Sequence, residues 1–325
     1  NGHDAIRTDC YIKAGNVYQG QQRYTQSIPY YHEALQLAGQ NNDTACLYQA
    51  ALYLGSARYS VSEVDSARYY FEYASGLANG KSHFPDLPIL YNSLGIIYFE
   101  AANYQQAINY FQLAADRLSP TDESYEESLV SFKINIAGCY SRLGKYSDAL
   151  QRYRELLPYK QLQASLFQNI GHTYYYLQQY DSSLYYFAKV PYQSSAAYAR
   201  LLNDKGRIYM QQQLLQRAEQ VFDSSINLFK QLPVRGRDKD KATSLLYRSQ
   251  LAQQQGLFNE AITWCNLALQ ELHFSFKDNY AESLPANETD VISPITFFHV
   301  LAHKASLLEG RYLQTNEVHW LESSL

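Results

Sequence analysis

Apolar residues recur along this chain at the spacing of helices that are packed on one side. Between residues 90 and 115 the sequence reads LYNSLGIIYFEAANYQQAINYFQLAA, in which small or apolar residues fall three or four positions apart. Residues at that spacing lie on one face of an α-helix, whereas a half-buried strand alternates apolar and polar positions. Almost no segment alternates in this way, and nine prolines and fifteen glycines are few for 325 residues. The pattern therefore predicts a nearly all-helical protein.

The same ladder of small and aromatic residues recurs at intervals of roughly 34 to 43 residues. Each copy has a small residue on a first helix, then a small residue followed four positions later by an aromatic one on a second helix. These marks include Gly15, Gly55, Gly95, Ala137, Gly171 and Gly206 on the first helices, and Ala107 with Phe111, Ala149 with Tyr153, and Ala218 with Phe222 on the second. Small residues let helices approach closely, so each copy predicts an antiparallel helix hairpin. In the third copy we expect Gly95 and Ala107 to make the closest approach.

This ladder resembles the pattern of the tetratricopeptide repeat (TPR) family, with tyrosine in place of the family's tryptophan. The matching residues are Tyr91, Leu94, Gly95 and Tyr98, followed by Ala107 and Phe111. The resemblance covers nearly the whole chain and implies a right-handed superhelical α-solenoid of about seven hairpins over residues 1–273, with one concave face. The expected repeats lie near residues 4–40, 43–80, 87–118, 124–157, 160–190, 195–231 and 240–273.

The ladder stops after the seventh copy. Residues 274–293 are rich in acidic residues, contain a proline and show no helical spacing, so we expect a long loop there. Helical spacing resumes over residues 294–325, which predicts an atypical last helix pair or a cap that closes the array.

A second resemblance concerns this C-terminal part of the chain. The segments WCNLALQELHFSFKDN and SPITFFHVLAHKASLLEGRYLQTNEVHWLESSL are similar to the helical region of bacterial proteins that continue into a CHAT domain, a caspase-like peptidase fold. The resemblance implies that the chain is a regulatory arm of a larger protein, with a His/Cys catalytic dyad beyond Leu325. It assigns no catalytic role to any residue of this chain.

Charge and cysteine usage exclude several classes of function. A formal net charge of −4, with 27 Lys and Arg against 31 Asp and Glu, offers no basic surface for nucleic acid. No apolar run is long enough to span a membrane, and because the chain starts at Asn1 we expect that a preceding segment has been removed. We expect a cytoplasmic protein. The four cysteines, which form no CxxC pair, are interpreted as small buried side chains rather than metal ligands.

The sequence contains no motif that predicts catalysis or cofactor binding. It has no glycine-rich phosphate loop, no HExxH and no GxSxG. His172 lies on the expected groove side of its helix, but no second ligand stands three or four positions away, so we interpret it as a hydrogen-bonding surface residue. We therefore expect no enzyme, no cofactor and no metal.

The family's geometry places the groove lining at fixed positions on each first helix, near the small-residue mark. In the middle of the array these positions select Asn92, Phe99, Arg142, Gln168, His172, Tyr175, Arg200, Asn203, Arg207 and Gln211. Amide and guanidinium groups suit the backbone and carboxylates of a peptide, and aromatic rings add contact area. The family's clamp for chaperone C-termini is incomplete, because Asn92 and Ile96 stand where lysine and asparagine belong.

Three hypotheses of function follow. The first is a non-enzymatic scaffold that binds a protein or peptide in the groove. The alternative is a sensor arm that controls a fused CHAT peptidase-like or other signalling domain. The third is self-association through the ends of the array, which the apolar segment ITFFHVLAHKASLL near the C-terminus favours.

Overall fold

The chain folds into α-helices joined mostly by short turns. The computed structural model describes residues 2–78, 84, 86–160, 162–233, 238–278, 280–281, 283–285 and 290–323. Over these residues sixteen α-helices follow one another and no strand forms, apart from a single bridge between His273 and Val291. The predicted all-α repeat architecture is confirmed.

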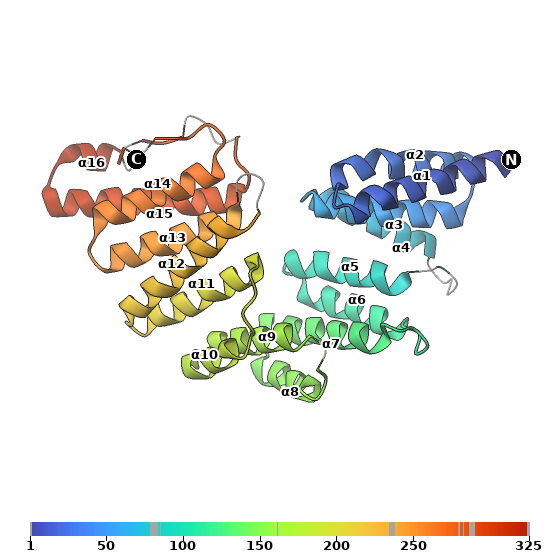
Figure 1. Cartoon of the computed structure of the whole chain (residues 1–325), viewed down its shortest axis with the longest axis horizontal. Helices are drawn as coiled ribbons and strands as arrows, with labels where there is room; N and C mark the ends of the chain where they lie inside the picture. The colour runs from blue at the N-terminus through green and yellow to red at the C-terminus, as the bar shows by residue number, and fades with distance from the viewer. Residues whose placement is uncertain are drawn as a thin grey trace. The chain divides into compact units, whose positions relative to one another are not determined.

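The chain divides into two units, Asn1–Thr173 and Tyr174–Leu325, and in each unit successive helix hairpins lie side by side (Figure 1). The helices that lie in the first unit are α1 (Gly2–Gly20), α2 (Tyr24–Gln40), α3 (Thr44–Ser60), α4 (Val64–Ala78), α5 (Leu87–Glu100), α6 (Tyr104–Asp116), α7 (Tyr125–Arg142) and α8 (Tyr146–Leu156). Helix α9 (Gln163–Tyr176) begins in the first unit and ends in the second. The second unit continues with α10 (Tyr180–Ala188), α11 (Ala196–Gln211), α12 (Leu215–Gln231), α13 (Lys239–Gln254), α14 (Phe258–Leu272), α15 (Pro294–Thr315) and α16 (Val318–Glu322).

A glycine against an aromatic ring joins the two helices of most hairpins. A Cβ atom added to Gly95 of α5 would lie 2.5 Å from Cε1 of Phe111 of α6, which is closer than any real Cβ contact. The same contact, with the ring sixteen residues after the glycine, recurs in the pairs Gly15 with Tyr31, Gly55 with Phe71 and Gly206 with Phe222. Only a residue without a Cβ allows this approach. The contact explains why a glycine recurs on the first helix and an aromatic residue on the second. In the third hairpin the ring of Phe111 supplies the atoms nearest to a Cβ on Gly95.

The turn after each first helix contains one residue in the left-handed conformation. These residues are Gln22, Ser62, Ala102, Gly144, Gln178, Gln213 and Gly256, with φ between 57° and 78°. In the third hairpin, the backbone N–H of Asn103 donates to the carbonyl oxygen of Tyr98 at 2.8 Å, and the side chain of Asn103 accepts from the N–H of Gln106. These bonds satisfy backbone groups that a helix leaves unpaired at its ends. Each hairpin therefore reverses direction within about three residues.

Many tyrosines are part of the scaffold. The rings of Tyr98 in α5 and Tyr110 in α6 stack with centroids 5.3 Å apart, and Tyr18 with Tyr30 and Tyr174 with Tyr186 stack in the same way. Stacked rings at this separation stabilise a hairpin beyond the area that they bury. Much of the unusual tyrosine content, 32 residues, is therefore explained by packing.

The helix α15 covers the last hairpin of the second unit. A Cβ on Gly310 of α15 would lie 2.5 Å from the ring of Phe258 of α14. Between α14 and α15 the described residues are not helical; Phe276 is buried, and the N–H of Ile292 donates to the carbonyl oxygen of Leu272 at 3.0 Å. This segment therefore packs back on the end of α14.

Candidate peptide-binding groove

Two adjoining pockets lie on the first-helix face of the first unit. The α3/α5 pocket has a volume of about 170 Å³ and is lined by Ser56, Tyr59, Ser60, Phe71, Ser93 and Ile96. The α5/α7 pocket has a volume of about 240 Å³, and its lining includes Ile96, Phe99, Glu100, Phe111, Asn135 and Asn169. Ile96 lines both pockets, so they are adjacent, and we call the two together the first-unit groove.

The two pockets are equivalent positions of successive hairpins. The residues four, five and sixteen positions after Gly55 are Tyr59, Ser60 and Phe71, and those after Gly95 are Phe99, Glu100 and Phe111. In each pocket the floor is the ring that presses on the glycine, and the far wall begins two positions before the next mark, at Ser93 or Asn135. The groove therefore repeats one subsite with a step of one hairpin.

Ser93 and Asn135, each two positions before a mark, line these pockets and are smaller than the residue at the equivalent position of the second unit. In the second unit the equivalent residue is Tyr247 of α13, which stands two positions before Ser249, the small-residue mark of the seventh copy. Its ring stacks on the floor ring Phe222 with centroids 5.8 Å apart. The guanidinium of Arg207 then lies 5.6 Å from the centre of the Tyr247 ring. A large side chain at this position fills the space that Ser93 and Asn135 leave in the first unit.

Internal hydrogen bonds orient the polar groups of the first-unit groove. The hydroxyl of Tyr59 in α3 donates to Oε1 of Glu100 in α5 at 2.7 Å, and burial together with this bond raises the pKa of Tyr59. Nδ2 of Asn135 donates to Oδ1 of Asn92 at 3.4 Å, and Nδ2 of Asn169 donates to the carbonyl oxygen of Ser165 at 2.9 Å. The bonds use amide N–H groups and leave Oδ1 of Asn135 and Asn169 available as acceptors.

The structure places three of the residues expected in the groove on this part of the first unit. Phe99 lines the α5/α7 pocket, Asn92 accepts the hydrogen bond from Asn135, and the guanidinium of Arg142 lies 5.8 Å from the centre of the Phe99 ring. Gln168 and His172 are half-buried on α9, where their neighbour Asn169 reaches the pocket.

The residues expected on the second unit make contacts within that unit. Arg207 donates to the hydroxyl of Tyr175 at 3.0 Å and lies over its ring, 5.0 Å from the centre. Gln211 is exposed. Arg200 forms an ion pair of 2.6 Å with Asp240 of α13. Arginine between aromatic rings is held in a fixed orientation, because stacking and the hydrogen bond act together.

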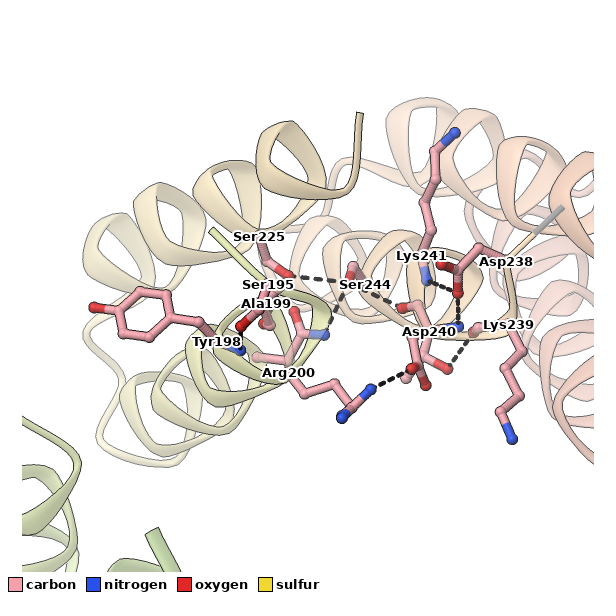
Figure 2. A network of polar contacts seen from close by, with 12 residues as sticks. Ser195, Tyr198, Ala199, Arg200, Ser225, Asp238, Lys239, Asp240, Lys241 and Ser244 are labelled. Atoms are coloured by element: carbon pink, nitrogen blue, oxygen red, sulfur yellow. Dashed lines mark hydrogen bonds and ion pairs between the residues drawn. The ribbon is translucent and has the colours of Figure 1, made fainter. Parts of the chain in front are cut away.

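A buried polar network accounts for Asn203. Figure 2 shows the contacts that join α11, α12 and α13, in which Ser225 donates to the carbonyl oxygen of Ala199 and lies 3.1 Å from Ser244. Nδ2 of Asn203 donates to Oγ of Ser244 at 2.8 Å, and the side chain is only 4% exposed. Asn203 was expected in the groove lining, but here it joins two helices of the scaffold.

Several lining residues were missed in the set expected from the sequence. Asn135, Asn169 and Ser93 each stand two positions before a mark, and Glu100 stands five positions after one. The same offset of five had selected Arg142 and Gln211, so applying it to every copy would have found Glu100. None of the residues expected in the groove stands two positions before a mark, so this rule could not have found Ser93, Asn135 or Asn169.

The cysteines differ from one another in burial. Cys139 and Cys265 are buried, and burial raises the pKa of each thiol to about 12, as expected for packing residues. The interpretation is wrong for Cys10, which is exposed, and Cys46 is half-buried. Within the described ranges, no three His, Cys, Asp or Glu side chains cluster as a metal site would require. No helix in the described part of the chain is long and apolar enough to cross a membrane.

Comparisons with known proteins identify the repeats. Two family models, both described as tetratricopeptide repeat, match residues 8–41 and 86–161. The chain therefore contains tetratricopeptide repeats over these segments, the second of which includes α5, α6, α7 and α8. In sequence it is 24% identical over 175 residues to anaphase-promoting complex subunit 6 of Arabidopsis thaliana; the match covers 54% of this chain and 29% of that protein. The chain thus spans less than a third of this curated relative.

Solved structures support the fold. The apo form of the quorum sensor NprR from B. thuringiensis matches 98% of this chain and 86% of its own, with a TM-score of 0.69 and 16% identity. YrrB, described as a TPR protein with an unusual peptide-binding site, matches 55% of this chain and 82% of its own, with a TM-score of 0.42 and 19% identity. The first similarity shows that the helical repeat arrangement is shared.

Proposed function

We propose that this chain is a non-enzymatic scaffold that binds a protein or peptide segment in the first-unit groove. The observation that carries the proposal is the pair of adjoining pockets, which repeat one subsite along α3, α5 and α7. Tetratricopeptide repeats are generally non-catalytic scaffolds, and such arrays bind partners on extended surfaces.

The chemistry of the groove supports a peptide rather than a compact small molecule. Phe71, Phe111 and Ile96 supply an apolar floor, and Asn135 and Asn169 supply side-chain amides at its wall. Each amide donates an N–H to a helix partner and keeps its Oδ1, which can accept from a peptide backbone N–H and so position the peptide independently of its sequence. Apolar side chains of the peptide then enter the pockets and supply binding energy.

The proposal is tested by selecting peptides from a display library on the unmodified protein. Their affinities are then measured for the double variant Asn135→Ala with Asn169→Ala and for the matched control Asn109→Ala, an exposed asparagine of α6. We expect the double variant to bind at least about tenfold more weakly, since it loses two polar contacts to the ligand. Unchanged affinity in the double variant, or an equal loss in the control, would place binding outside the groove.

Exposed apolar side chains on α15 favour two alternatives: a sensor arm that contacts a fused domain, and self-association of the chain. The exposed face of α15 carries Ile295 (74% exposed), Phe298 (47%) and Leu313 (76%). Exposed apolar side chains at the two ends of one helix are surfaces that another domain or a second copy could cover. The similarity of this region to CHAT-domain proteins stays a prediction. Light scattering over a dilution series tests self-association, since a monomer at every concentration contradicts it.

A further inference from the structure

The wall of the first-unit groove offers mainly hydrogen-bond acceptors. The hydroxyls of Ser56 and Ser93 donate to the carbonyl oxygens of Leu52 and Ile89 of their own helices, at 3.1 and 2.8 Å. Their oxygens, like Oδ1 of Asn135 and Asn169, can therefore only accept a further bond. A ligand that satisfies this wall has to bring N–H groups of its own.

Glu100 gives the groove a negative charge between its two pockets. It is the charged residue of the lining, and the bond from Tyr59 directs its carboxylate toward α3. Among the described residues, no lysine or arginine forms an ion pair with Glu100. The guanidinium of Arg142 comes from α7 and lies over Phe99. The negative charge at the edge of the α5/α7 pocket, beside Tyr59 of the α3/α5 pocket, is therefore complementary to a basic side chain.

The spacing of the pockets selects the conformation of the ligand. One lies between α3 and α5 and the other between α5 and α7, so they flank α5 and share Ile96, and the width of a helix with its side chains sets them about 10 Å apart. In a polyproline II helix, residues three apart lie on the same side and are about 9 Å apart. Residues on one face of a β-strand are about 7 or 13 Å apart, and neither distance matches the spacing of the two pockets well.

An α-helical ligand meets the spacing but not the hydrogen bonding. Residues seven apart on a helix are about 10 Å apart, close to one step of the groove. However, the backbone N–H groups of a helix are already bonded to its own carbonyls, so they cannot satisfy Asn135, Asn169 or Ser93. A polyproline II segment has no internal hydrogen bonds, and each of its residues other than proline offers a free N–H.

We propose that the first-unit groove binds a basic polyproline II segment with two apolar side chains three residues apart. One apolar side chain enters each pocket, a lysine or arginine between them pairs with Glu100, and backbone N–H groups donate to Asn135 and Asn169. This inference rests on the proposed function, since it names the class of peptide that the same groove would take.

The test uses short labelled peptides and the full chain. The reference peptide contains Leu-Arg-Pro-Leu between glycines; the comparison peptides place the leucines two or four residues apart or replace the arginine by glutamate. Binding is followed by fluorescence anisotropy. We expect the reference peptide to bind at least about tenfold tighter than either spacing variant, because those can fill only one pocket.

Two variants of the protein locate the peptide. Glu100→Gln should weaken binding of the arginine peptide about two- to fivefold, the range of an exposed ion pair, whereas Glu127→Gln, at an exposed glutamate of α7, should not. Ser93→Tyr introduces the residue type that Tyr247 supplies at the equivalent position, so it should fill the α3/α5 pocket without unfolding the hairpins. In that variant, replacing one of the two leucines by alanine should have no further effect.

The outcomes separate this inference from the proposed function. Equal affinity at all three spacings, no effect of Glu100→Gln, or no binding up to about millimolar concentration overturns the inference. If library-selected peptides depend on Asn135 and Asn169 but lack the three-residue spacing, the inference fails and the proposed function stands. If no selected peptide depends on the groove, both fail.

Discussion

We expect His303 to make the packing of the C-terminal helix α15 sensitive to pH. Its Nε2 lies 3.0 Å from Oγ of Ser249 in α13, and Ser249 in turn donates to the carbonyl oxygen of Ala261 at 2.6 Å in α14. Burial lowers the pKa of His303 from its ordinary value of 6.5 to about 4. The contact therefore ties three helices together through an imidazole that is neutral in the folded protein.

The size of the acid-induced loss in unfolding free energy follows from the difference between the pKa values of His303 in the folded and unfolded chain. Between pH 6.5 and pH 4 the unfolded chain binds a proton at His303 and the folded chain does not, so acid favours unfolding. The contribution is fully present above pH 6.5 and is lost as the pH falls toward 4. A difference of about 2.5 in pKa corresponds to about 3 kcal/mol of unfolding free energy.

Tryptophan fluorescence can follow this effect, because both tryptophans, Trp264 and Trp320, lie in the last helices. Urea unfolding is measured at several values between pH 7 and pH 4.5, for the wild type, His303→Gln and the control His299→Gln, at an exposed histidine of α15. We expect the acid loss in the wild type and the control, and a much smaller loss in His303→Gln. Parallel losses in all three proteins would refute the reasoning.

Two further predictions concern the packing of the hairpins. Gly95→Ala places a Cβ against the ring of Phe111 and should lower the unfolding free energy by about 1–3 kcal/mol, whereas Gly76→Ala, with open space around it, should raise it by about 0.5–1 kcal/mol. Ala102→Gly should stabilise the protein by about 0.5–1 kcal/mol, because Ala102 has φ 57°, and Ala101→Gly, at φ −75°, should not. Urea unfolding followed by far-UV circular dichroism measures all four variants, and the same sign within either pair would contradict the argument.

The sequence predicts the helices and their pairing because both depend on short-range patterns. The sixteen-residue interval between a glycine and an aromatic ring, as in Gly55 and Phe71, is visible without coordinates, and so is the helical spacing between them. The detail of the contact was not predicted. Gly95 and Ala107 were expected to make the closest approach of the two helices; the atoms nearest to a Cβ on Gly95 belong to the ring of Phe111, since an aromatic side chain reaches farther across the hairpin than alanine does.

The candidate site was less predictable, because contacts between helices decide which polar residue faces the groove. Arg200 and Asn203 have the composition of lining residues, but Asp240 and Ser244 on the neighbouring helix bind them. Those partners lie about 40 residues away in the sequence, at an offset that the ladder does not mark. A rule of fixed positions therefore also selects side chains that bind a partner on the neighbouring helix, at the surface for Arg200 and in the interior for Asn203.

The openness of the groove depends on one position of each following hairpin. Phe71, Phe111 and Phe222 occupy equivalent positions and press on glycines in the same way. Two of these rings form pocket floors, while Phe222 is covered by Tyr247. The floor is thus set by the contact that stabilises the hairpin, and access to it is set by a residue with little role in that contact. We therefore expect that a substitution two positions before a mark changes access to a pocket without loss of the fold.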